Sequence, residues 1–258
     1  MNIVQLDKIS YYRQNRKILD NINLNIQKDQ NWVFLGGNGS GKTTLVNILY
    51  GYLWATSGTV CLFGKLFGEV PLSEIQKRIG ILQSSHQGAM LQKRLSVKDV
   101  LATGILSTIG YYGSITDEDE KKIQNMIESN QWIKNKDQNY STLSSGEKKK
   151  LLLLRALIRD PELLVLDEPC SSMDITARED FFSFLKEYRN KLGFPTILIT
   201  HRTDEIPSYF SHVLMLKEGK VLISGTLQDT MTDKNLSELY SIPIRIQKIG
   251  NRFYSHVI

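Results

Sequence analysis

The residues best suited to chemistry are in a glycine-rich stretch, FLGGNGSGKTTL at residues 34–45. Gly36, Gly41, Lys42 and Thr43 fit the pattern G-x-x-x-x-G-K-[ST], in which glycines let backbone N–H groups surround a phosphate. The lysine adds a charge for β and γ phosphates, and the following hydroxyl can bind Mg²⁺. The alternative is an ordinary tight turn with a surface lysine. We favour the phosphate site, whose predicted residues are Gly36, Gly37, Asn38, Gly39, Ser40, Gly41, Lys42, Thr43 and Thr44.

A phosphate site of this kind needs a carboxylate to hold the metal, and the stretch LLVLDEP supplies two acids. Asp167 ends an apolar run, where it can hold Mg²⁺ directly or through water, and Glu168 can polarise a water toward a γ-phosphate. Two acids at a strand end are also common on protein surfaces. The buried strand before them makes the site the better interpretation, because ligands bind at the carboxyl ends of parallel strands.

The elements that would position these residues alternate between strand and helix. Residues 3–28 read as strands, residues 96–160 as mainly helical, and ELLVLDEP and PTILITH as buried parallel strands. Gly250 and Asn251 lie between two alternating runs, which predicts a hairpin at about 243–258. We expect one α/β domain over residues 1–258, with a helical lobe inserted at about 88–160, and we expect hydrolysis not to require the hairpin.

Length and composition fit a single α/β domain, and they argue against a secreted protein and against a chain that spans a membrane itself. The chain has 258 residues, a formal charge of +5 and two cysteines too far apart to form a metal motif. The N-terminal MNIVQLDKIS lacks the pattern of a signal peptide, and the apolar run KLLLLRALI is too short to span a bilayer. We therefore expect a protein of a reducing compartment, whose role at a membrane would need a partner chain.

A third motif makes the assignment more specific, because Leu143-Ser144-Ser145-Gly146-Glu147 precedes an apolar helix that leads into the Asp167 strand. Together with GGNGSGKT, this order resembles the ATP-binding subunit of ABC transporters over about residues 1–230. Further marks follow in the family's order: Gln83 as the Q-loop glutamine, Ser172-Met173-Asp174 as the D-loop and His201 as the switch histidine. The resemblance implies a P-loop NTPase fold with a mixed sheet core, an N-terminal antiparallel β subdomain and an inserted helical lobe.

The resemblance also implies roles for single residues. Ser144 and Gly146 would bind the γ-phosphate of ATP held by a second subunit, and Asp174 would reach across the dimer interface. Gln83 would sense Mg²⁺ and the attacking water, Glu168 would act as general base and His201 would contact the γ-phosphate. The catalytic set is Glu168, His201, Gln83 and Lys42, and the metal set is Thr43, Gln83 and Asp167.

The signature motif departs from the family pattern, and the residue that stacks on adenine is not decided by the sequence. The signature reads LSSGE rather than LSGGQ, so Ser145 replaces a glycine and Glu147 a glutamine. The family stacks an aromatic residue on adenine, and only one of Tyr11 and Tyr12 can do so because neighbours on a strand face opposite ways. Arg13 could stack instead. We select Tyr12. Lys148, Lys149 and Lys150 read as the solvent face of a helix.

The function that follows is an ATPase that uses ATP and Mg²⁺ and powers an ABC transporter by ATP-driven dimerisation. The expected partners are a second ATPase subunit, in a homodimer, and a separate transmembrane permease that contacts residues 84–97. The expected location is cytoplasmic, on the inner face of the cell membrane. The alternative is an ABC ATPase that acts on nucleic acid or ribosomes. Such proteins mostly carry two cassettes or coiled arms, so we expect no nucleic acid partner here.

Overall fold

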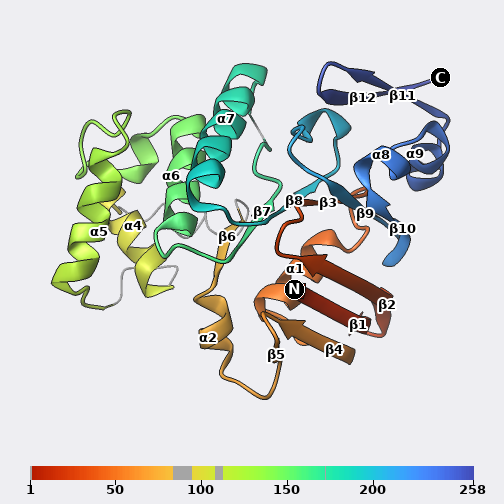
Figure 1. Cartoon of the computed structure of the whole chain (residues 1–258), viewed down its shortest axis with the longest axis horizontal. Coiled ribbons are helices and arrows are strands. Elements are labelled where there is room, and N and C mark those ends of the chain that lie inside the picture. The colour runs from red at the N-terminus through yellow and green to blue at the C-terminus, as the bar shows by residue number, and fades with distance from the viewer. Residues whose placement is uncertain (1, 84–94, 108–112, 172) are drawn as a thin grey trace. The chain divides into compact units, whose positions relative to one another are not determined.

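Strands and helices alternate along the chain, which confirms the α/β class predicted from the sequence (Figure 1). The structure is a computed structural model that describes residues 2–83, 95–107, 113–171 and 173–258. The chain divides into two compact units, Met1–Ile75 with Pro195–Ile258 and Gln76–Phe194. The segment predicted as a helical lobe, about 88–160, falls within the second unit.

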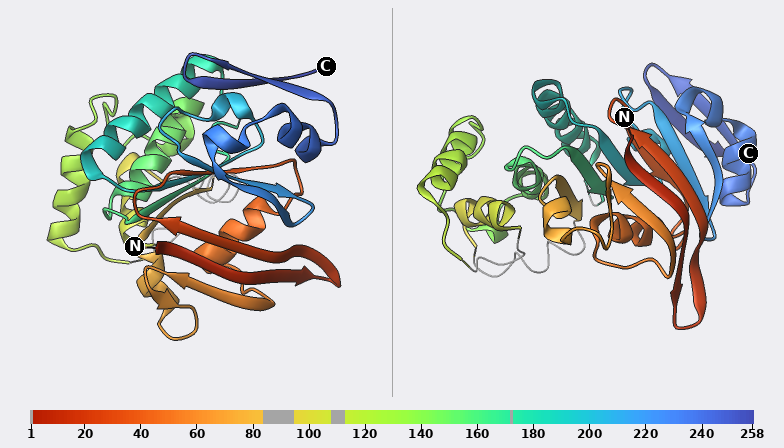
Figure 2. Two further views of the ribbon diagram at one scale, coloured as in Figure 1. Left: turned by 45° about the vertical axis from the view of Figure 1, so that its right-hand side comes forward. Right: turned by 60° about the horizontal axis from the view of Figure 1, so that its bottom comes forward.

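An antiparallel sheet of four strands lies in the first unit, as the family resemblance implied (Figure 2). Its order is β2-β1-β4-β5, with bounds β1 Asn2–Arg13, β2 Arg16–Gln27, β4 Ser57–Leu62 and β5 Lys65–Leu66. The turn between β1 and β2 is made by Gln14 and Asn15, which both have positive φ (47° and 62°), as a tight hairpin turn requires. Alternate residues of β2 are buried, because one face of this strand packs on the core.

Parallel strands in the same unit carry the loops that matter for chemistry. The strand β3 (Trp32–Leu35) is fully buried and pairs in parallel with both β8 (Thr196–Thr200) and β9 (His212–Lys217). The strand β10 (Lys220–Thr226) pairs with β9 in the antiparallel sense. Leu35 is in register with both Thr200 and Met215, so the loops after β3, β8 and β9 leave the sheet at one edge.

The remaining elements of this unit are short helices and a terminal hairpin. The helices are α1 (Lys42–Tyr50), η2 (Thr203–Glu205), α8 (Leu227–Thr230) and α9 (Asp233–Tyr240). A further helix, α2 (Leu72–Gln76), lies at the boundary between the two units. The hairpin consists of β11 (Ile244–Ile249) and β12 (Arg252–Val257), which pair around Gly250 and Asn251.

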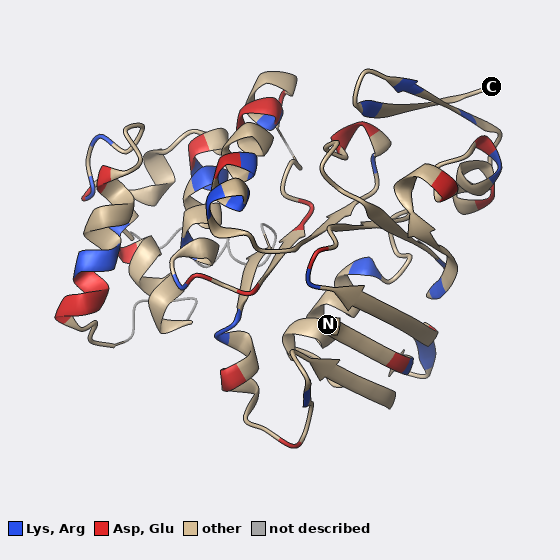
Figure 3. Cartoon of the chain, in the orientation of Figure 1, with Lys and Arg blue, Asp and Glu red and all other residues tan. Residues whose placement is uncertain are grey.

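The second unit combines two parallel strands with a group of helices. The strands β6 (Ile79–Gln83) and β7 (Leu163–Asp167) are fully buried and adjacent. The helices are α4 (Val97–Leu106), α5 (Asp117–Glu128), η1 (Tyr140–Thr142), α6 (Ser145–Leu157) and α7 (Ile175–Leu192). Four acidic residues form the first turn of α5, where they complement the helix dipole (Figure 3). The helices α4 and α6 meet at a buried hydrogen bond from Arg155 Nε to Thr103 Oγ1 (2.8 Å).

Candidate active site

The loop between β3 and α1 can follow its path only with glycine at two positions. A Cβ on Gly36 would lie 2.3 Å from the carbonyl oxygen of Leu216, near the end of β9. Gly41 has φ +104°, and a Cβ there would lie 2.7 Å from Leu19 Cδ2. The remaining loop residues Asn38 and Gly39 are exposed. The predicted cradle, residues 36–41, is therefore a tightly supported turn with its tip open to solvent.

The first turn of α1 has the properties of an anion site. Each of the other described helices of eight or more residues, α4, α5, α6, α7 and α9, has an N-cap side chain that accepts a backbone hydrogen bond. The N-cap of α1 is Gly41, no side chain caps it, and its first turn contains no acid. No side-chain cap or acid therefore competes with a phosphate at this helix start, and the helix dipole attracts an anion there.

Lys42 lies at that helix start and is directed toward the loop. It is only 5% exposed, and its Nζ donates hydrogen bonds to the carbonyl oxygens of Gly36 (2.8 Å) and Gly37 (2.9 Å). A buried ammonium held over the loop is well placed for a phosphate that the loop encloses. Thr43 and Thr44 follow on the first turn of α1, and Thr43 is exposed.

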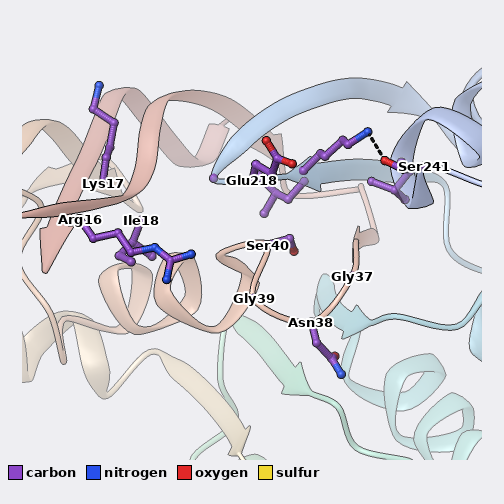
Figure 4. A pocket seen from close by; sticks show the side chains of 13 residues that line it. Arg16, Lys17, Ile18, Gly37, Asn38, Gly39, Ser40, Glu218 and Ser241 are labelled. Carbon is purple, nitrogen blue, oxygen red and sulfur yellow. Dashed lines mark hydrogen bonds between the residues drawn. The ribbon is translucent and has the colours of Figure 1, made fainter.

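A cavity of about 570 Å³ adjoins the loop tip (Figure 4). Its walls are residues 37–40, residues 16–18 of β2 and residues 216–219, with Leu239 and Ser241. The Arg16 side chain extends toward the loop, whereas Lys17 points away from it. Ser40 Oγ is buried and has no hydrogen-bond partner among the described residues. The β2 residues were not among the predicted site residues. The two cations Arg16 and Lys17, four and five positions after Tyr12, could have indicated them, because cations attract a polyphosphate.

The residue selected for adenine stacking lies next to this wall. Tyr12 is 45% exposed and sits opposite Lys17 in the β1–β2 register. The Lys17 Nζ is 5.4 Å from the centre of the Tyr12 ring, a cation–π distance. The carboxylate of Asp20 and the Tyr12 hydroxyl raise the pKa of Lys17 above its usual value. Tyr12 as the stacking residue stays a prediction.

His201 follows β8 directly, so it leaves the sheet at the same edge as Gly36. His201 is exposed, and hydrogen bonds join the residues on either side of it. Buried Thr200 shares a hydrogen bond with the carboxylate of Glu205 and accepts another from the backbone N–H of Arg202 (3.1 Å). The backbone of His201 thus follows β8 at the edge where the phosphate loop follows β3, and its role as a switch histidine stays a prediction.

In the second unit, two predicted metal-site residues lie together. Gln83 and Asp167 end the adjacent strands β6 and β7 in register, and the Gln83 amide donates to Asp167 Oδ2 at 3.4 Å. Both are buried, at 3% and 6% exposure. The described residues contain no cluster of three or more His, Cys, Asp or Glu that could hold a metal. One buried carboxylate beside an amide oxygen still fits Mg²⁺, which usually completes its shell with water and substrate phosphates.

Glu168 follows Asp167 in an unusual backbone conformation. Its φ is +46°, a left-handed value that costs a non-glycine residue on the order of 1 kcal/mol or more. Strain of this kind persists where a side chain must point in a particular direction. The left-handed turn redirects the chain immediately after a buried strand, and Glu168 is only half-buried.

Lys149 approaches the same turn, which corrects its assignment to a solvent face. Its Nζ lies 3.5 Å from the hydroxyl oxygen of Ser171, and the residue is half-buried. Burial lowers the pKa of Lys149 to about 8, and the charges of Cys170 and Glu168 partly oppose that shift. No local pattern predicts this contact, because Lys149 is the middle one of three consecutive lysines and nothing in the sequence distinguishes it from the other two.

The signature residues form a separate pocket with the start of α7. Ser144, Gly146 and Asp174 all line a cavity of about 540 Å³ in the second unit. Ser144 is the N-cap of α6, and its hydroxyl accepts from the backbone N–H of Glu147 (3.3 Å). Asp174 is the N-cap of α7 and accepts from the N–H of Ala177 (2.7 Å). The structure thus brings three of the predicted binding residues together at two helix starts, in a pocket that the carboxylates of Glu147, Asp174 and Asp180 and the cation Lys150 also line.

Comparisons with known proteins decide the family. A family model described as ABC transporter matches residues 19–171 of this chain. The ABC transporter ATP-binding protein YlmA of Bacillus subtilis is 37% identical over 250 residues, which cover 95% of this chain and 93% of YlmA. An ABC transporter ATP-binding protein of Streptococcus mutans is 33% identical, over 98% of this chain and 97% of that protein. The chain belongs to the ABC transporter ATP-binding family. It is therefore an ATP-binding subunit of a transporter, and an ATPase.

A solved structure supports the fold of this cassette. The cbiO1 protein of Clostridium perfringens, described as part of the ABC transporter complex cbiONQ, matches with a TM-score of 0.76 and 26% identity. The match covers 92% of the cassette and 93% of cbiO1. The P-loop NTPase fold implied by the resemblance is thus confirmed.

The signature of this cassette differs from the family pattern at Glu147. Its carboxylate accepts from both the backbone N–H (2.8 Å) and the hydroxyl (2.7 Å) of Ser144, which completes a capping box. These two hydrogen bonds hold the pKa of Glu147 below its usual value, so the carboxylate is ionised at neutral pH. A glutamine would cap the helix equally well, so the departure adds a negative charge to the signature pocket rather than changing the fold.

Two further expectations concern segments at the edge of what the structure covers. The segment expected to contact a permease, residues 84–97, lies mostly outside the described residues, and so does Ser172 of the D-loop. Among the described residues of the cassette, no helix is both long and apolar enough to cross a membrane.

Proposed function

We propose that the cassette binds Mg-ATP on the loop at residues 36–44 and hydrolyses it as one half of a dimer coupled to a membrane permease. The observation that carries this proposal is the buried Lys42, held at 2.8 and 2.9 Å over the loop carbonyls at the start of a helix that no side chain caps. Phosphoryl transfer needs mainly positioning and charge stabilisation, which such a cradle provides.

The remaining roles are those that the family resemblance implies. Glu168, which has a left-handed backbone directly after β7, accepts a proton from the attacking water. His201, which follows β8, contacts the γ-phosphate. Thr43, Asp167 and Gln83 would hold Mg²⁺, which would neutralise charge on the phosphates. Tyr12 stacks on the base, beside the cations of the β1–β2 turn.

The dimer follows from the second pocket. Ser144, Gly146 and Asp174 line a pocket that belongs to a different unit of the chain from the phosphate loop. We infer that this pocket binds the γ-phosphate of ATP held by a second copy of the chain, in a head-to-tail homodimer. The Glu147 carboxylate opposes that contact electrostatically, so we expect a loose dimer that forms only with ATP.

The partner that the cycle drives is a separate transmembrane permease, which places the cassette on the cytoplasmic face of the membrane. The support is the match to cbiO1, a subunit of a transporter complex, together with family membership. Purification of the tagged cassette from detergent-solubilised membranes should recover a polytopic membrane protein. Recovery of ribosomes or nucleic acid in its place would support the alternative function.

The experiment that tests the nucleotide site uses Lys42→Ala. Removing the ammonium should weaken ATP binding at least about tenfold and abolish hydrolysis, because a charge-assisted contact to phosphate is worth about 1.5–3 kcal/mol. Lys28→Ala, which removes an exposed lysine after β2, is the matched control. Isothermal titration with ATP and circular dichroism measure binding and fold. An unchanged affinity in Lys42→Ala would show that the loop is not the phosphate site.

A further inference from the structure

The loop that carries His201 is fastened to the C-terminal part of the chain. The hydroxyl of Tyr240, the last residue of α9, donates a hydrogen bond to the carbonyl oxygen of His201 at 2.7 Å. Burial raises the pKa of Tyr240 to about 12, so the phenol keeps its proton and stays a donor at physiological pH. The bond holds the backbone of His201 and does not involve its ring.

The terminal hairpin holds the rest of the same loop. Thr203 donates from Oγ1 to the hydroxyl oxygen of Ser255 on β12 (3.0 Å), and Thr203 itself is buried. Arg252 Nη1, also on β12, donates to the carbonyl oxygen of Asp204 (3.1 Å). Figure 1 shows the hairpin next to the turn that follows β8. Three hydrogen bonds from the C-terminal segment thus reach three residues of a five-residue loop.

The hairpin and α9 are connected to each other as well as to the loop. Ser237 Oγ accepts from the backbone N–H of Ile244 (2.8 Å), and Asp233 Oδ1 accepts from that of Ile246 (2.7 Å). We call α9 with β11 and β12, residues 233–257, the C-terminal clamp. Because its two parts are joined, a movement of the hairpin is passed to Tyr240.

We propose that the C-terminal clamp holds the switch loop, residues 201–205, in its working position and that Tyr240 is a positioning residue for His201. This inference rests on the proposed role of His201. A group that contacts a transferring phosphate must be held to within about half an ångström, and an exposed loop residue needs external contacts for that. The proposal replaces the expectation, made from the sequence, that hydrolysis does not require the hairpin.

The test compares Tyr240→Phe with Tyr254→Phe. Phenylalanine keeps the ring of Tyr240 and removes only the donor, while Tyr254 is an exposed tyrosine on β12 that serves as the matched control. We expect Tyr240→Phe to lower kcat about fivefold, the equivalent of one hydrogen bond of about 1 kcal/mol, with the ATP dissociation constant unchanged. Hydrogen–deuterium exchange should speed up about fivefold for the peptide that contains residues 201–205.

Three outcomes separate this inference from the proposed function. Unchanged kcat and unchanged exchange in Tyr240→Phe would overturn the clamp, provided that His201→Ala lowers hydrolysis. A fall in kcat accompanied by an equal loss of ATP affinity would also overturn it, because the clamp does not touch the phosphate loop. Full activity in His201→Ala would remove His201 from the proposed mechanism, and the clamp with it.

Discussion

The pKa of Lys149 depends mainly on how its side chain packs in the fold and not on its neighbours in the sequence. Burial is the main cause of its lowered pKa of about 8, against an ordinary value of 10.5. The folded state therefore binds fewer protons than the unfolded state between about pH 8 and pH 10.5. The free energy of unfolding should rise with pH across this interval, and the cost of the buried charge should be fully present below pH 8.

Lys149→Met tests this cost. Methionine fills a similar space without a charge, so the variant should unfold with a free energy higher by about 1–2 kcal/mol at pH 7. The difference from the parent should shrink between pH 8 and pH 9.5 in urea unfolding. Lys121→Met, at an exposed position on α5, controls for loss of a lysine in general. A constant difference across this pH range would show that burial does not perturb Lys149.

At the scale of elements, the phosphate loop depends on one close approach to the end of strand β9. A Cβ on Gly36 would meet the Leu216 carbonyl oxygen at 2.3 Å and Ser40 Oγ at 2.7 Å, whereas a Cβ on Gly37 would meet no atom within 4 Å. Gly36→Ala should therefore lower the free energy of unfolding by about 2 kcal/mol or more, while Gly37→Ala should change it by less than about 0.5 kcal/mol. Thermal unfolding of both variants measures this. Equal stability would mean that the loop after β3 does not pack against the end of β9 as described.

The elements differ in how far the sequence could predict them. Apolar runs that end in glycine or aspartate identified β3 and β7, because both strands are buried on two faces. The contact of Gln83 with Asp167 depends on the register of two strands 84 residues apart, and no local pattern reports it. The hydrogen bond from Tyr240 to His201 spans 39 residues and joins the end of α9 to the loop after β8, so no local pattern predicts it either. Arg16 and Lys17 lay in a predicted strand but became site residues only through the cavity they line.

At the scale of the whole molecule, the proposed head-to-tail homodimer needs two copies of the chain to complete each ATP site. The phosphate loop and the signature pocket lie in different units of one chain, and the phosphate loop leads into a helix start that no side chain caps. Dimerisation should therefore depend on ATP that has not been hydrolysed.

The most direct test of this claim is the molar mass of Glu168→Gln by light scattering. Glutamine keeps the shape and hydrogen bonding of Glu168 but cannot accept a proton, so hydrolysis should fall by at least about a hundredfold while ATP still binds. The account predicts a dimer with saturating Mg-ATP and a monomer with ADP. Adding Ser144→Arg, which fills the signature pocket, should return the ATP sample to monomer. A Glu168→Gln protein that stays monomeric with saturating Mg-ATP, or that hydrolyses ATP at the parent rate, would contradict the account.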